Sequence, residues 1–386
     1  MLEIRTIRGQ KSWILRSSTV ELAVTHLGAH MAPVIFEADS ACGIEPYAIS
    51  PWQGEMQGQP AGGSELPLRG DFFCLPFGSG PAPQGELHPP HGATSSAIWT
   101  LIEEKTSGDR HKLTLGMNTP VRSGRVTRTY ELQDGHNVVY GTTSIEGFAG
   151  PVTLGHHAVL ALPQLEGSLL LSSSPISAGF TSPQPFARPE WGSYQSLAIN
   201  KSFRSLRRVP SIFRGVDRVD CSAFPARTGF TDLLQIAQKP HRNQPCWVTA
   251  VNTDANYLWF AFKDPSILPS TILWIENRGR HQPPRSGRNC SLGVEDVCSY
   301  FDLGIQAAMH ANPFQERGVP TFHRLTTDNP FVVRYVQGAV RTPAGFGRVQ
   351  EVKFGEEEVV FVDEIGKRLR APIRYRFVMG EQEGKN

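Results

Sequence analysis

The chain has 386 residues, of which 39% are hydrophobic and 19% charged, a balance typical of a globular protein with a sizeable core. With 38 Lys and Arg against 36 Asp and Glu the net charge is +2, which excludes the electrostatic footprint of a nucleic-acid or membrane-surface partner. The 37 glycines and 30 prolines punctuate turns and favour many short strands over long helices. The composition therefore indicates an all-β protein.

Cysteine usage and the absence of long apolar runs indicate a cytoplasmic protein. The six cysteines are scattered without a CxxC pair, so we expect buried free thiols and no metal site. The first residues lack the apolar core of a secretory signal. No apolar run approaches the roughly 20 residues that a membrane span needs.

Short apolar runs separated by turn signals predict strands along the first half of the chain. Residues 12–37 predict two or three strands, and residues 40–66 predict a long irregular connection. Residues 97–147 predict an antiparallel meander, because Gly-containing turn signals separate its apolar runs at hairpin spacing.

The second half continues this pattern. Residues 151–163 predict an apolar strand, 172–196 a loop rich in Ser, Pro and Gly, and 303–310 a helix. Further strands are predicted at 233–236, 246–251, 257–262, 271–277, 331–336, 349–354, 358–362 and 373–378. No linker, charge shift or repeat divides the chain, so we expect one domain spanning residues 1–386.

Four places in the sequence carry side chains suited to proton transfer on a polar, neutral ligand. They are Arg69, His91, the adjacent pair His156 and His157, and Glu295. Neighbouring residues on a strand point to opposite faces, so only one of the two adjacent histidines can face a given cleft.

An Arg-rich loop at 278–288 offers a second kind of interaction. Its arginines suit phosphate or carboxylate, so Arg280 is a candidate for substrate binding. Solvation or pairing with local acids explains such a loop equally well. The short basic run 204–208 is interpreted as a solvated face.

Taken in order, these segments resemble the galactose mutarotase-like superfamily, that is, aldose 1-epimerases and the related hexose-6-phosphate mutarotases. The resembling parts are Arg69–Gly78, His91-Gly92, Gly155-His156-His157-Ala158 and Gly293-Val294-Glu295. The resemblance spans residues 15–305. It implies a large antiparallel β-sandwich with few short helices, present as a monomer or homodimer.

The resemblance also implies a reaction, the interconversion of the α and β anomers of a small-molecule sugar by ring opening. Glu295 matches the glutamate that takes the proton from the C1 hydroxyl. His156 matches the strand histidine that protonates the ring oxygen, with His157 as the alternative. His91 matches a histidine that holds sugar hydroxyls or assists the acid.

Two further residues match binding positions of the family. Arg69 matches an arginine at the substrate mouth, and Asp232 lies in the interval of a sugar-binding aspartate. Histidine and glutamate suffice for the proton transfers, so we expect no cofactor. The second arginine that follows the His-Gly motif in the hexose-6-phosphate branch is missing here, which leaves the phosphorylation state of the substrate open.

Two other classes of function stay open. A carbohydrate-binding or sensing protein could keep the same fold with little catalysis. A glycosidase or lyase would need a second carboxyl group across a cleft from Glu295, and Asp71 and Asp232 are the candidates. Asp296 is unsuited, because it neighbours Glu295 on a strand and points the other way.

Overall fold

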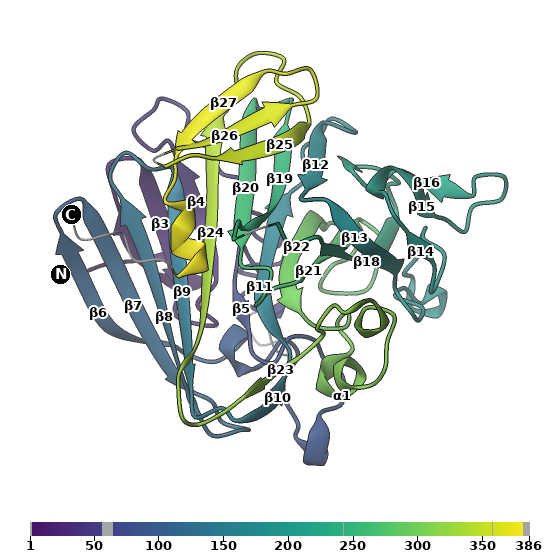
Figure 1. The fold of residues 1–386 in the computed structure, drawn as a ribbon, viewed down its shortest axis with the longest axis horizontal. Helices are drawn as coiled ribbons and strands as arrows, with labels where there is room; N and C mark the ends of the chain where they lie inside the picture. The colour runs from purple at the N-terminus through teal and green to yellow at the C-terminus, as the bar shows by residue number, and fades with distance from the viewer. Residues whose placement is uncertain (1, 56–64, 242, 357, 381–386) are drawn as a thin grey trace.

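Two large antiparallel sheets face each other across the main hydrophobic core in the computed structural model, which describes residues 2–55, 65–241, 243–356 and 358–380. Figure 1 shows most of the nine-stranded sheet side by side. Its order is β17 (Ala223–Phe224), β12 (Leu169–Ser173), β19 (Cys246–Asn252), β20 (Tyr257–Lys263), β24 (Phe331–Arg341), β9 (Val138–Glu146), β8 (Arg125–Gln133), β7 (Arg110–Asn118) and β6 (Thr100–Ser107). The predicted meander therefore forms β6 to β9.

The seven-stranded sheet lies opposite and carries most of the predicted site residues. Its order is β14 (Ser202–Phe203), β13 (Ile176–Thr181), β18 (Phe230–Gln238), β21 (Ser270–Asn277), β22 (Cys290–Cys298), β11 (Leu154–Ala161) and β5 (Phe73–Cys74). The pairs among β13, β18, β21, β22 and β11 are all antiparallel. The expected antiparallel β-sandwich is confirmed.

Smaller sheets complete the described chain. One sheet contains β1 (Glu3–Ile7), β2 (Gln10–Arg16), β3 (Val20–Thr25) and β4 (Met31–Phe36). Another contains β25 (Val349–Phe354), β26 (Glu358–Asp363) and β27 (Arg368–Pro372), which lie against the nine-stranded sheet and share a second hydrophobic cluster with it (Figure 1). Two-stranded pairs form between β10 (Gly150–Val152) and β23 (His323–Leu325) and between β15 (Val209–Pro210) and β16 (Arg218–Val219).

Helical segments are short throughout the described ranges. The predicted helix near residue 305 is confirmed as α1 (Gly304–Met309). The 3-10 turns are η2 (Pro83–Gly85), η3 (Ala93–Ser95), η4 (Pro189–Trp191), η5 (Leu206–Arg208), η6 (Gln315–Arg317) and η7 (Tyr375–Met379). None of these described helices has the length and apolar character that crossing a membrane requires.

Two predictions of local structure are wrong. The stretch 172–196, predicted as a loop, contains strand β13, which pairs with both β14 and β18. The stretch 373–378, predicted as a strand, forms most of the 3-10 turn η7, whose Tyr375 and Val378 pack into the second hydrophobic cluster. In both cases tertiary contacts override the local pattern.

Alternation along the seven-stranded sheet separates two environments. One face, with residues such as Ala158 and Val294, belongs to the core between the large sheets. The other face, with Val159 and Trp274, belongs to a third hydrophobic cluster outside the sandwich. Because side chains alternate along a strand, adjacent polar residues of this sheet are divided between these two faces.

Candidate active site

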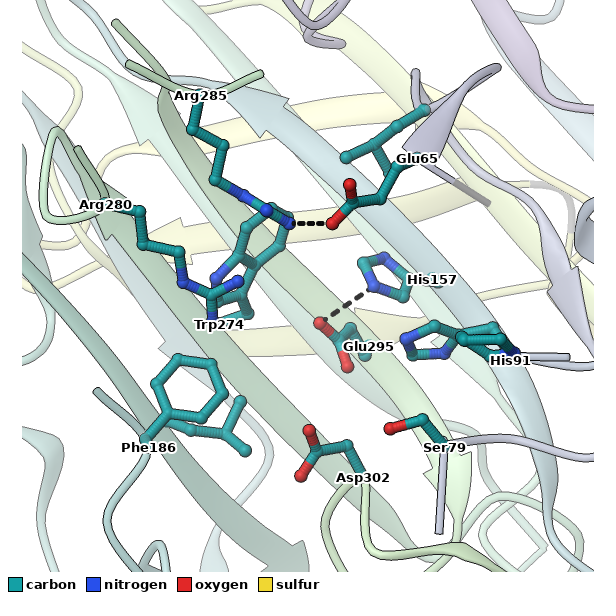
Figure 2. A pocket seen from close by; sticks show the side chains of 13 residues that line it. Glu65, Ser79, His91, His157, Phe186, Trp274, Arg280, Arg285, Glu295 and Asp302 are labelled. Atoms are coloured by element: carbon teal, nitrogen blue, oxygen red, sulfur yellow. Dashed lines mark ion pairs between the residues drawn. The ribbon is translucent and has the colours of Figure 1, made fainter. Parts of the chain in front are cut away.

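A pocket of about 280 Å³ lies on the outer face of the seven-stranded sheet (Figure 2). Four consecutive strands each contribute one side chain to its floor. Leu233 comes from β18, Trp274 from β21, Glu295 from β22 and His157 from β11. Leu233 lies opposite Trp274 across one strand pair, and Glu295 lies opposite His157 across another. The floor therefore follows directly from strand register.

A glycine makes room for two of these side chains. Gly293 lies opposite Trp274 and two residues before Glu295 on the same face. A Cβ at this position would lie 2.7 Å from Glu295 Oε1 and 2.9 Å from Trp274 Cβ. Any larger residue at position 293 would displace the carboxyl group or the indole.

Glu295 and His157 form a buried acid–base pair on the floor. Glu295 Oε1 lies 3.2 Å from His157 Nε2, with 4% and 6% of the two side chains exposed. Burial, reinforced by the charge of Asp302, raises the pKa of Glu295 well above its ordinary value. Burial and the neighbouring His91 lower the pKa of His157 well below its own. Both shifts favour the uncharged form of the group concerned.

His91 lies beside this pair and is held by its surroundings. Its ring meets that of His157 edge to face, with centroids 5.0 Å apart, and its Nδ1 lies 3.6 Å from Cys74 Sγ. Burial lowers the pKa of His91 to about 4, which keeps the imidazole neutral at pH 7.

The glycine of the His-Gly motif has a steric role. Gly92 forms an isolated parallel bridge with Leu75, and its φ is +77°. A Cβ on Gly92 would lie 2.0 Å from the Leu75 carbonyl oxygen. Only glycine permits this close approach, which fixes the backbone next to His91.

Two arginines of the Arg-rich loop line the pocket, and both have carboxylate partners. Arg285 Nη2 lies 2.7 Å from Glu65 Oε1, and Arg280 Nε lies 3.4 Å from the buried Glu276 Oε2. The Arg280 guanidinium also lies over the ring of Phe186, 4.7 Å from its centroid. Pairing offsets most of the positive charge that a free anion site would need.

Asp302 is a pocket residue that the sequence analysis missed. It follows β22 in a turn, and its carbonyl oxygen accepts a 2.9 Å hydrogen bond from the Ser79 N–H. Figure 2 shows its carboxyl group and that of Glu295 directed into the same space. Burial raises the pKa of Asp302, and within the described chain its carboxyl group has no hydrogen bond to another side chain. Its position in a loop at a strand end was the available signal.

The turn that carries Asp302 is strained and tightly held. Phe301 has a φ of +49°, which is unfavourable for a bulky residue. The Gln235 side chain clamps the turn, since its Nε2 donates to Ser299 O at 2.9 Å and its Oε1 accepts from Phe301 N at 2.7 Å. Strain retained beside a pocket is typical of a functional site.

His156 does not line the pocket, in contrast to its predicted role as the acid. It points between the two large sheets, where its Nδ1 lies 3.0 Å from Asp71 Oδ2 and its ring stacks on Tyr335 at 4.0 Å. Arg128 binds the same Asp71 oxygen at 2.7 Å. Strand alternation is the reason, and the alternative residue His157 occupies the pocket face.

Arg69 and Asp232, predicted to bind substrate, also lie away from the pocket. Arg69 is fully buried and donates to the carbonyl oxygens of Ile7 and Arg8 and to Gln53 Oε1. Asp232 accepts hydrogen bonds from the backbone N–H groups of Ser196 and Leu197. Arg69 therefore connects the segment before β5 to the N-terminal hairpin. Asp232 holds the backbone of the loop at residues 196–197 against β18.

Two more acidic residues face the interior, the candidate Asp71, and Asp296, which the sequence analysis excludes. Asp71 binds His156 and Arg128, and Asp296 binds Lys263 and Tyr335. The described chain contains no group of three or more His, Cys, Asp or Glu side chains arranged to hold a metal ion.

Solved structures with a similar fold include proteins described as galactose mutarotase-like or galactose mutarotase related. A galactose mutarotase-like protein from Clostridium acetobutylicum has a TM-score of 0.57 and 11% identity, covering 88% of this chain and 98% of its own. A protein from Escherichia coli K12, named provisionally as an aldose 1-epimerase, has a TM-score of 0.55 and 13% identity, covering 86% of this chain and 99% of its own.

A third structure, a galactose mutarotase related enzyme from Lactobacillus acidophilus, has a TM-score of 0.52 and 11% identity. It covers 89% of this chain and all of its own. No protein-family model and no curated protein matches the sequence. At these identities the likeness establishes the fold, and the argument for an activity rests on the site.

Proposed function

We propose that this protein is a mutarotase that interconverts the α and β anomers of an aldose. The observation that carries the proposal is the buried Glu295–His157 pair, 3.2 Å apart, on the floor of a small polar pocket. The pocket volume of about 280 Å³ lies just below the range of roughly 300–1,000 Å³ usual for ligand sites and suits a ligand as small as one sugar ring.

Buried polar atoms without a hydrogen-bond partner among the described residues that line the pocket support the binding of a polar ligand. Within the described chain two buried atoms of lining residues have no hydrogen-bond partner, His157 Nδ1 and Trp274 Nε1. Buried polar groups normally have partners, so their gathering in one pocket favours a ligand rich in hydroxyl groups.

The reaction needs one proton removed and one delivered. The step starts from the form of the pair in which Glu295 is ionised and His157 is protonated. Glu295 takes the proton of the C1 hydroxyl while His157 protonates the ring oxygen, and the bond between C1 and the ring oxygen breaks. The products are the open-chain aldehyde and the uncharged Glu295–His157 pair, the form that burial favours. Rotation about C1–C2 presents the other face of the carbonyl. Ring closure then returns both protons, so neither residue is consumed.

The surrounding residues bind and orient the sugar. His91, neutral at pH 7, hydrogen-bonds a hydroxyl group next to the reacting carbon. Asp302 accepts a hydrogen bond from a further hydroxyl, and its charge keeps the pKa of Glu295 high. Arg280 donates from the opposite wall.

The alternative functions differ from the proposal in what they require. For a glycosidase, the candidate second carboxyl groups were Asp71 and Asp232, and neither lines the pocket. Asp302 does line it, so hydrolysis deserves a direct assay. A sensing protein would bind sugar without accelerating anomer exchange.

The test follows anomer exchange by polarimetry for freshly dissolved aldoses and their 6-phosphates. We expect wild-type protein to accelerate equilibration of at least one sugar, and Glu295→Gln to lower this rate by roughly 10²–10⁴-fold, because glutamine cannot take the proton. Glu104→Gln, an exposed glutamate on β6, is the control. Equal rates for wild type and Glu295→Gln would refute the mechanism.

The same samples separate the other classes of function. Saturable sugar binding without acceleration would indicate a sensing protein. Release of free sugar from a glycoside panel would indicate a glycosidase.

A further inference from the structure

A second hollow, at the β14 edge of the seven-stranded sheet, gathers arginines from three separate parts of the chain. Its volume is about 420 Å³, larger than that of the sugar pocket. Arg204 follows β14, Arg208 ends η5, Arg218 begins β16 and Arg317 ends η6. No acidic side chain is among the described residues that line it. The run 204–208, predicted to be a solvated face, lies in the fold beside Arg218 and Arg317, which are farther away in the sequence.

The charges of this hollow are mostly uncompensated. In the described chain Arg204, Arg208 and Arg218 have no ion pair, and Arg317 reaches only its neighbour Glu316, at 3.9 Å on the surface. The arginines of the sugar pocket differ, because Arg280 and Arg285 each have a carboxylate partner.

Arg207, which lies between Arg204 and Arg208 in the sequence, differs from both in having an ion-pair partner. Arg207 forms a 2.8 Å ion pair with Glu364, whereas Arg204 and Arg208 on either side form none. Like charges brought together without counter-charges repel one another, and an anion bound among them would relieve that repulsion.

Two of the guanidinium groups are already oriented by the protein. Arg317 Nη1 donates to Pro313 O at 2.7 Å, and its guanidinium lies 4.9 Å from the centroid of the Phe180 ring. Arg218 Nη1 donates to Arg208 O at 3.1 Å. Each anchored group keeps further N–H donors for a ligand, and pre-orientation lowers the entropy lost on binding.

We propose that this hollow binds a multiply charged oxyanion, the phosphate or sulfate group of a ligand. The planar guanidinium matches the oxygen geometry of such groups and binds them through paired hydrogen bonds. The hydroxyl groups of Ser202 and Ser205 also line the hollow and add neutral donors. The proposal is independent of the mutarotase function, since it concerns different residues and a different surface.

Isothermal titration calorimetry with inorganic pyrophosphate tests the proposal on the full chain. We expect one site on the wild type and a loss of affinity of about tenfold or more in Arg204→Gln/Arg218→Gln, the effect of removing a charge-assisted hydrogen bond. The control Arg125→Gln/Arg368→Gln removes the same charge from exposed residues of β8 and β27 and keeps the affinity.

Three results would overturn the site. They are unchanged affinity in the hollow variant, an equal loss in the charge-matched control, or a loss in Arg285→Gln that places the anion in the sugar pocket instead. Competition then identifies the source of the anion. Displacement of pyrophosphate by a hexose 6-phosphate supports a small phosphorylated ligand, and displacement only by a heparin oligosaccharide supports a polyanionic chain.

Discussion

The adjacent histidines of β11 provide a matched pair of substitutions. His156 and His157 are almost equally buried, with 1% and 5% of the residue exposed, but face opposite sides of the sheet. His156→Asn removes the bond to Asp71, a charged partner worth about 1.5–3 kcal/mol, and the Tyr335 stack, worth about 0.5–1.5 kcal/mol. We therefore expect this variant to lose about 2–4.5 kcal/mol of unfolding free energy and to keep most of its activity.

His157→Asn removes the partner of Glu295 and leaves the core network untouched. We expect its rate of anomer exchange to fall by roughly 10²–10⁴-fold, the usual contribution of a general acid or base. Its loss of unfolding free energy is expected to be the smaller of the two, because the pocket admits water.

Urea unfolding and polarimetry on both variants separate the two roles. We expect mainly stability to fall in His156→Asn and mainly activity to fall in His157→Asn. A His156→Asn protein that folds normally and is inactive, beside a His157→Asn protein with full activity, would refute the assignment of faces.

Two further substitutions test single groups. Burial lowers the pKa of His30 to about 3, and its Nε2 donates to Ser95 O at 2.8 Å. From pH 6.5 downward only the unfolded chain binds this proton, so the group removes about 1.4 kcal/mol of stability per pH unit. Urea unfolding at pH 6.5 and pH 5 should give a flatter pH dependence for His30→Gln, and parallel slopes would contradict this. Asp302→Asn should raise the KM for the sugar, because one hydrogen-bond acceptor for a hydroxyl group is lost. It also removes a negative charge that raises the pKa of Glu295, so the acid limb of the pH–rate profile should move to lower pH. An acid limb at the same pH as in the wild type would contradict the electrostatic coupling between Asp302 and Glu295.

Most of the fold is predictable because hairpins have strong local signals. Alternating or largely apolar runs between Gly- or Asp-containing turns predict the strands β7, β8, β9, β19 and β20. Strands that follow one another in the chain then pair, β7 with β8, β8 with β9 and β19 with β20. That residues 1–386 form a single domain stays a prediction.

The two errors of local structure have a common physical origin. Strand β13 reads Ile-Ser-Ala-Gly-Phe-Thr, with few β-branched residues, and Gly179 is needed because a Cβ there would lie 2.6 Å from the Phe203 ring. The stretch 373–378 begins with alternating apolar and charged residues like a strand. In the structure the Arg374 N–H donates to Tyr140 OH, and the apolar residues of η7 pack in the second hydrophobic cluster with the nine-stranded sheet. Neither contact is visible in the local sequence.

The site was predictable in its residue types more than in its geometry. Sequence spacing shows that His156 and His157 point apart, but the face that meets the pocket depends on sheet packing. Arg69 likewise looks like a substrate residue until the carbonyl groups of the N-terminal hairpin are seen to occupy its donors. The position of Asp302 in a loop at a strand end is a weak signal in the sequence. That it lines this pocket follows only from the folded turn after β22, where its carbonyl oxygen accepts a hydrogen bond from Ser79 N–H.

The strands β22 and β11 carry polar side chains on both faces, and those on the face opposite the pocket have partners in the core. Behind Glu295, its neighbour Asp296 accepts hydrogen bonds from Lys263, Thr271 and Tyr335. Behind His157, its neighbour His156 binds Asp71. Buried charges are costly unless paired, and the contacts of Asp296 with Lys263 and Tyr335 cross from one large sheet to the other.

Glu295 and His157 thus each have a neighbour on the same strand that is held by contacts in the core. Lys263 and Tyr335 belong to β20 and β24 of the nine-stranded sheet, whereas Asp296 belongs to β22. These cross-sheet contacts restrict sliding of β22 and β11 relative to the opposite sheet, and β22–β11 register sets the 3.2 Å separation of Glu295 and His157. Each strand therefore carries two adjacent polar residues, one that faces the pocket and one whose contacts fix the strand in place.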